Sequence, residues 1–207
     1  MPMQNRVTPS GDLIATSARG TMFGNRGGRF HRDDRTLGAR RYVSRRWICC
    51  VLDFKGRHRD VWGRGYTELF FLDEVTALAA GHRPCFECRR RDAKAFASFW
   101  AKAHRMKEAP SADAMEEVIH SERIRGRDKL RHSMAIDTLP DGAMLNFPEK
   151  PQEMFAVRGT RLLRWSPSGY RGPVARPRGV TVDVLTPRSI VRTLAAGFHP
   201  RWHCSAR

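Results

Sequence analysis

Short runs rich in apolar residues, with a period of two, predict strands in the first half of the chain. Between residues 47 and 54, the apolar side chains of Ile48, Cys50 and Leu52 recur at every second position. This period of two is the spacing of one face of a β-strand. A second short strand is predicted over residues 67–72, after a turn region that contains glycine.

Residues that begin and end helices follow the second predicted strand along the chain. Asp73 and Gly81 mark the beginning and the end of a short helix, because aspartate accepts hydrogen bonds from free helical N–H groups and glycine adopts a positive φ readily. A longer helix is predicted to begin at Asp92, and a third helix spans about residues 114–122. The apolar stripe of the longer helix consists of Phe96, Phe99, Trp100, Ala103 and Met106.

The last third of the chain is predicted to be mostly antiparallel β, closed by one helix. The predicted strands span residues 143–147, 153–157, 161–165 and 180–185. Thr186 is the expected cap of the final helix, which begins at Pro187 and ends at Gly197. The fold class is therefore α+β, with short strands and three to four helices.

Three regions are expected along the chain. Residues 1–46 contain scattered glycines and arginines with little periodicity, which predicts an irregular basic arm. Residues 47–132 form an α+β region around a zinc knuckle. Residues 133–207 form a small β-rich region with a C-terminal helix, packed as one unit with the region before it.

The net charge of the chain indicates which kind of partner it binds. The 207 residues include 38 lysines and arginines and 21 aspartates and glutamates, which gives a formal net charge of +17. Because 41% of the residues are hydrophobic, the chain can bury a core and is not a disordered basic tail. A charge so far from zero favours a polyanionic partner, and nucleic acid is the leading candidate. A solvated arginine-rich surface, or a surface that binds an acidic protein, is the alternative.

The expected cellular location is inferred from two kinds of segment that the sequence lacks, a membrane span and a signal peptide. No apolar run approaches the length of about 18 residues that a membrane span needs, and the N-terminal residues lack the apolar core of a signal peptide. We therefore expect a cytoplasmic protein that contacts no membrane.

The cysteines carry the strongest chemical signal. Cys85 and Cys88 form a C-x-x-C motif after a helix stop and a proline, a context that favours a zinc knuckle over a redox pair. Tetrahedral zinc needs four ligands, so two more are required. Of the adjacent Cys49 and Cys50, only one can face a given ion from a straight strand, and we favour Cys50. Cys204 is the predicted fourth ligand, with His203, Cys49, His58 and His82 as the alternatives.

The residues around this motif also carry a resemblance. The run YTELFFLDEVTALAAGHRPCFECR, residues 66–89, resembles the second half of the Ada-type zinc-binding domain of bacterial alkylation-repair proteins. The resemblance implies that Cys85 and Cys88 bind zinc, that DNA phosphates are contacted, and that a zinc thiolate accepts a methyl group from a DNA phosphate. The chain departs from the family in having adjacent Cys49 and Cys50 where the family has C-x-x-x-C, and His82 where it has an aromatic residue.

Two arginine runs bracket the predicted metal site and form the expected phosphate-binding face. Arginine suits this role because its planar guanidinium binds phosphate in a bidentate manner. The predicted contacts are Arg40, Arg41, Arg45, Arg46, Arg89, Arg90 and Arg91.

A separate cluster is the candidate catalytic site. His120, Glu122 and Arg123 fall close together at a helix end, where Arg123 would bind a phosphate and His120 would act as a general base. A solvated helix end is the alternative for these residues. The sequence contains no P-loop, no G-x-G-x-x-G, no H-E-x-x-H and no G-x-S-x-G motif.

These observations predict a zinc-stabilised, strongly basic protein that binds nucleic acid, DNA rather than RNA. The alternative is an enzyme that processes nucleic acid, either a nuclease built on His120, Glu122 and Arg123 or a thiolate-based DNA alkylation-repair protein.

Overall fold

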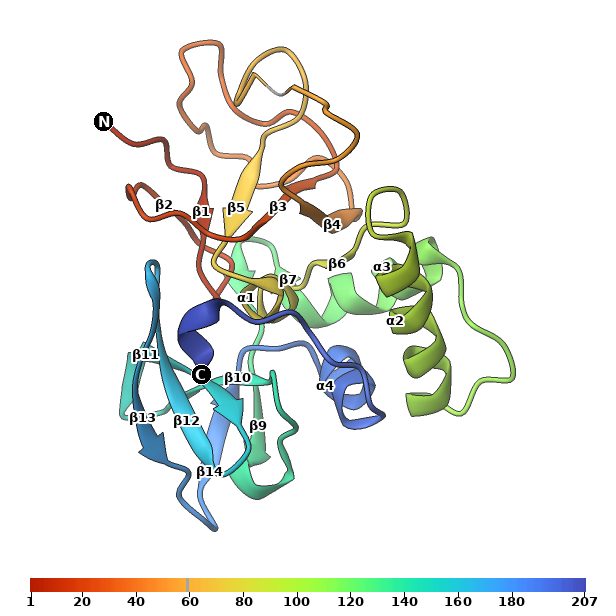
Figure 1. The fold of residues 1–207 in the computed structure, drawn as a ribbon, viewed down its shortest axis with the longest axis vertical. Coiled ribbons are helices and arrows are strands. Elements are labelled where there is room, and N and C mark those ends of the chain that lie inside the picture. Colours follow the sequence, from red (N-terminus) through yellow and green to blue (C-terminus); the bar gives the residue numbers. More distant parts are fainter. Residues whose placement is uncertain (59) are drawn as a thin grey trace.

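The computed structural model describes residues 1–58 and 60–207, and its fold is α+β (Figure 1). Within these residues, the first half of the chain forms a mixed six-stranded sheet in the order β2-β1-β5-β3-β4-β6. Its strands are β1 Arg6–Val7, β2 Leu13–Ile14, β3 Met22–Arg26, β4 Trp47–Val51, β5 Leu69–Phe71 and β6 Arg83–Pro84.

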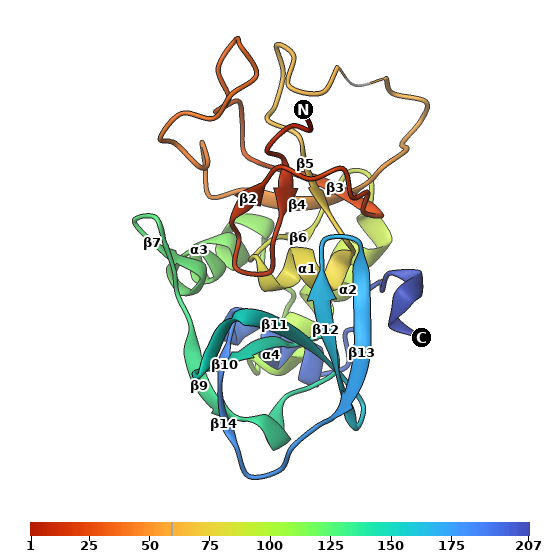
Figure 2. The same cartoon turned by 90° about the vertical axis from the view of Figure 1, so that its left-hand side faces the viewer.

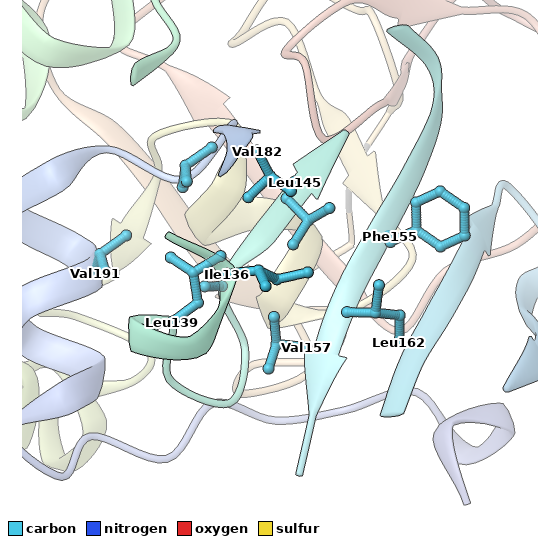
Figure 3. Packing of buried hydrophobic residues seen from close by; sticks show 10 residues of the cluster. Ile136, Leu139, Leu145, Phe155, Val157, Leu162, Val182 and Val191 are labelled. Carbon is cyan, nitrogen blue, oxygen red and sulfur yellow. The ribbon is translucent and has the colours of Figure 1, made fainter. Parts of the chain in front are cut away.

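The C-terminal half forms a second six-stranded sheet that is antiparallel throughout, in the order β13-β12-β11-β10-β14-β9. Figure 3 shows the apolar core on one face of this sheet, which includes Leu145, Val157 and Val182 from its own strands. A small hairpin of β7 and β8 precedes this sheet. The strands are β7 Ile124–Arg125, β8 Asp128–Lys129, β9 His132–Ala135, β10 Met144–Phe147, β11 Lys150–Arg158, β12 Arg161–Ser166, β13 Gly169–Ala175 and β14 Thr181–Val184.

The helices lie between and beside the sheets. They are α1 Glu74–Ala79, α2 Arg90–Ala103, α3 Ala112–Arg123 and α4 Arg188–Ala195. All six residues of α1 are buried, and Figure 2 shows this helix between the two sheets. Ala77 packs against the first sheet, Val75 against the second, and Leu78 against α2, α3 and α4. The helix is therefore enclosed on every side, as its many small and apolar residues require.

Both ends of α1 are where the sequence predicts them. Asp73 caps the helix, because its side chain accepts from the N–H of Thr76 at 2.9 Å. The same carboxylate accepts from the Tyr170 hydroxyl at 3.2 Å and from the backbone N–H of His203 at 3.0 Å, so it also ties the second sheet and the C-terminus to α1. Gly81 follows the helix at φ +85°.

The prediction that residues 1–46 form an irregular arm is wrong for the parts of this segment that form strands. Residues 1–46 supply β1, β2 and β3, and β3 lies in the sheet between β4 and β5. The glycines that suggested irregular structure permit close packing instead, since a Cβ on Gly24 would lie 2.1 Å from the carbonyl oxygen of Ile48. The arm is therefore a structural part of the first sheet.

Two predicted helix caps, Asp92 and Thr186, differ from the structure. The long helix begins at Arg90, and Asp92 lies in its first turn, where it forms an ion pair with Arg89 at 2.8 Å. Ser111 caps α3 by accepting from the N–H of Ala114. Thr186 accepts from the backbone N–H of Met144 at 2.9 Å, so it links α4 to β10 and does not cap the helix. Among the residues described, none of the helices is long and apolar enough to cross a membrane.

A buried carboxylate joins α3 to the first sheet. Glu116 is 2% exposed and forms ion pairs with Arg83 at 3.1 Å and with Arg123 at 2.9 Å. It also accepts from the backbone N–H of Trp47 at 3.1 Å. One carboxylate thus holds β4, β6 and the end of α3 together.

We predict that Glu116→Gln lowers the free energy of unfolding by about 3–5 kcal/mol, because two buried guanidinium groups lose their counter-charge. Asp113→Asn is the matched control, since it breaks the exposed Arg46–Asp113 pair and should cost less than about 1 kcal/mol. Denaturant unfolding measures both. Equal effects of the two substitutions would contradict the role given to Glu116.

Candidate metal centre

The structure brings together three of the four cysteines predicted to bind metal. Cys50 comes from β4, and Cys85 and Cys88 come from the turn between β6 and α2. Their sulfur atoms all lie within 4.8 Å of one another, and these three thiols could hold a metal ion. Thiolates are the ligands that zinc and other soft metal ions prefer.

Strand pairing explains this arrangement. β4 and β6 run parallel, with Cys49 opposite Pro84, and the N–H of Cys85 donates to the carbonyl oxygen of Cys49 at 2.9 Å. Alternation along β4 sends the Cys49 side chain into the core of the first sheet and the Cys50 side chain to the other face, beside Cys85. The preference for Cys50 over Cys49 therefore agrees with the structure.

The three thiols interact strongly with one another. Hydrogen bonds between Cys50 and the other two thiols, together with burial, raise the pKa of Cys50. The hydrogen bonds that Cys85 receives from Cys50 and Cys88 lower the pKa of Cys85. Its sulfur also accepts from the backbone N–H of Glu87 at 3.4 Å. Negative charge is thus favoured at Cys85, as a metal ligand requires.

The thiols line a surface cleft of about 780 Å³. Its wall carries exposed Arg57 and Arg64, and the exposed ring of Tyr66. No motif in the sequence marks Arg57 or Tyr66 as functional, although both lie in the segment before the predicted strand 67–72. Other lining residues are Phe23, Ile48, Phe54, His58, Asp60, Arg46, Arg83 and Glu87.

The predicted fourth ligand, Cys204, lies elsewhere. It is exposed in a short 3₁₀ helix, Cys204–Ala206, that contacts β13, and it does not belong to the cysteine group. His203 caps that helix by accepting from the N–H of Ser205. His82 is fully buried and faces Arg26 at 3.4 Å. Of the alternatives, His58 is the one that lines the cleft with the three thiols.

The predicted phosphate-binding arginines separate into exposed and buried groups. Arg41 is half-buried, whereas Arg40, Arg45, Arg46, Arg90 and Arg91 are exposed. Arg89 is 3% exposed and forms ion pairs with Glu74 at 2.7 Å and Asp92 at 2.8 Å. Its guanidinium also lies 3.6 Å from the Cys49 sulfur. The prediction that Arg89 contacts phosphate is therefore wrong, because the guanidinium is buried and its N–H groups already pair with the buried Glu74 and the half-buried Asp92.

The predicted catalytic cluster is a structural network. Arg123 is 1% exposed, and Glu122 accepts from both the N–H and the hydroxyl of Ser189. His120 Nδ1 lies 3.0 Å from an Arg123 N–H group, which can only donate, so Nδ1 accepts and Nε2 carries the proton. In this tautomer neither ring nitrogen of His120 is free to act as a base. The nuclease role assigned to His120, Glu122 and Arg123 does not fit this geometry.

Comparisons with protein-family models, with curated proteins and with solved structures found no match for this chain. Its function must therefore be inferred from the cysteine cluster and the cleft beside it.

We predict that the purified wild-type protein contains about one equivalent of metal and that the Cys85→Ser, Cys88→Ser double variant contains none, because a single remaining thiol cannot chelate the ion. Elemental mass spectrometry on protein prepared without chelator measures the content. Cys204→Ser is the matched control and should keep its metal. Equal metal content in the double variant and the wild type would contradict the assignment.

Proposed function

We propose that this chain binds one zinc ion through Cys50, Cys85 and Cys88 and binds nucleic acid with the basic surface around that centre. The observation that carries the proposal is the position of the three thiols, which line a cleft whose walls also hold exposed arginines. Zinc suits three thiolates and needs no redox chemistry. The cytoplasm, where thiols stay reduced, is the compartment that fits such a site.

The fourth zinc position faces the cleft under this proposal. His58 lines the same cleft and is the candidate among the predicted alternatives that does so. A solvent molecule or a substrate atom would fill it otherwise, as in zinc sites that keep one open position. His58→Ala should therefore lower zinc affinity if the imidazole is a ligand and leave it unchanged if solvent fills the position.

The nucleic-acid part of the proposal rests on charge and on the groups in the cleft. The net charge of +17 favours a polyanion, and Arg57 and Arg64 place guanidinium groups on the cleft wall. Arg57 forms an exposed ion pair with Glu87 at 2.8 Å, which is weak enough to be exchanged for a phosphate. Tyr66 is 55% exposed beside them and offers a ring on which a base can stack. We propose DNA as the preferred partner and RNA as the competing one.

The same geometry favours one second candidate, thiolate-based repair of alkylated DNA. The sulfur atoms border an arginine-lined cleft, so a bound phosphate methyl ester could approach them. In this reaction a new sulfur–methyl bond forms, the methyl–oxygen bond breaks, and the phosphodiester leaves as an anion. Intact-protein mass spectrometry after exposure to methylated DNA would show the addition of one methyl group to Cys50, Cys85 or Cys88, and no addition would exclude this candidate.

We predict that duplex DNA binding weakens steeply as salt rises and that Arg57→Ala, Arg64→Ala together reduce it. Each lost phosphate contact should flatten the slope of log K against log salt by about 0.9. Fluorescence anisotropy on DNA and RNA duplexes at several salt concentrations measures the slope.

The matched control is the double variant Arg161→Ala, Arg178→Ala, which removes the same charge from two exposed positions, one in β12 and one in the loop between β13 and β14. It should retain the wild-type slope. Affinity that stays flat with salt, or equal losses in the two double variants, would contradict binding at the cleft.

A further inference from the structure

A second pocket lies on the opposite face of the first sheet. It has a volume of about 320 Å³ and is lined by residues of β2, of the ends of β3 and β4 and of the end of α3. Arg26 and Trp47 are ladder partners and face this pocket, whereas their neighbours Asn25 and Ile48 face the metal cleft. The two sites therefore use alternate residues of the same two strands.

The lining of this pocket is strongly cationic. Among the described residues that line it, Asp12 is the one acidic group, and it is exposed and accepts from the Ser10 hydroxyl. The cationic lining residues are Arg26, Arg41, Arg123, Arg127 and Lys129.

Arg26 is the central residue of this pocket. It is 2% exposed, and no carboxylate in the described part of the chain forms an ion pair with it. Its N–H groups meet neutral acceptors, namely the carbonyl oxygens of Gly11 at 2.7 Å and Arg41 at 3.4 Å and the His82 ring. A buried charge without a counter-charge is costly, so the fold retains Arg26 at an energetic penalty.

Two further cations lie beside it. The ammonium group of Lys129 donates to the carbonyl oxygen of Ala79 at 2.5 Å and has no carboxylate partner among the described residues. Burial and the charges of Arg123 and Arg26 lower the pKa of Lys129 to about 7. Arg123 shares the Glu116 carboxylate with Arg83, and its buried Nε has no hydrogen-bond partner in the described structure. The pocket thus lacks one or more negative charges.

We propose that this pocket binds a phosphate group. Phosphate supplies the missing negative charge in one compact ligand, and its oxygens match the N–H groups of arginine and lysine. The indole of Trp47 is 2% exposed and already covered by the guanidinium groups of Arg26 and Arg123, each 4.0 Å from the ring. Stacking of a base on Trp47 is therefore blocked, and the phosphate is the part of the ligand that is recognised.

Two sources can supply this group: a free phosphate or small phosphomonoester, and the terminal phosphate of a nucleic acid. The proposal does not rest on nucleic-acid binding at the metal cleft, because the two pockets share no lining residue. Phosphate binding that persists in the Arg57→Ala, Arg64→Ala variant would show this independence directly.

Titration calorimetry with inorganic phosphate at constant ionic strength tests the proposal. Wild type should bind about one phosphate, and Lys129→Gln should weaken binding about tenfold or more, since a charge-assisted hydrogen bond is lost. Arg127→Gln provides a second variant at an exposed position, where folding is not at risk. Lys94→Gln, an exposed position on α2, is the matched control and should bind as wild type does.

Absence of saturable phosphate binding, or equal weakening by Lys94→Gln and Lys129→Gln, would overturn the proposal. Oligonucleotides with a 5′-phosphate or a 5′-hydroxyl separate the two sources. A preference for the 5′-phosphate that Lys129→Gln abolishes assigns the pocket to nucleic-acid ends. Equal binding of the two oligonucleotides, with phosphate binding retained, assigns it to the free anion.

Discussion

The parallel pairing of β4 with β6 is the constraint on which the rest of the structure depends. The hydrogen bond from the Cys85 N–H to the Cys49 carbonyl oxygen sets the register of this pair. That register places Cys50 beside the C-x-x-C turn on one face of the sheet. On the other face it directs Trp47 toward the cationic pocket. A shift of one residue would exchange the two faces and remove both sites.

The buried arginines show how the fold manages its large positive charge. Arg89 forms an ion pair with the buried Glu74, whereas Arg83 and Arg123 share the single carboxylate of Glu116, so one charge of that pair has no counter-charge of its own. Among the described residues, the hydrogen-bond acceptors of the Arg26 guanidinium are all neutral. Under the phosphate proposal a bound anion completes the Arg26 site, because a buried charge without a counter-charge is costly. The exposed arginines of the metal cleft remain available for a polyanion.

Local signals in the sequence predicted much of the fold and part of the metal centre. The period of two in β4 identified the face of Cys50, and Asp73 and Gly81 marked both ends of α1. Contacts between distant segments could not be predicted in this way. Arg89 pairs with a glutamate on another helix, and the arm that contains Gly24 pairs with strands that follow it. Whether a basic residue is buried depends on such pairings, which leave no periodic pattern.

X-ray absorption at the zinc edge tests most directly whether three thiolates hold the ion beside the cleft. For wild-type protein we predict three sulfur ligands at about 2.3 Å and one nitrogen or oxygen ligand at about 2.0–2.1 Å. The same spectrum should be obtained from the Cys204→Ser variant. Four sulfur ligands, or a zinc ion without sulfur ligands, would contradict the site formed by Cys50, Cys85 and Cys88.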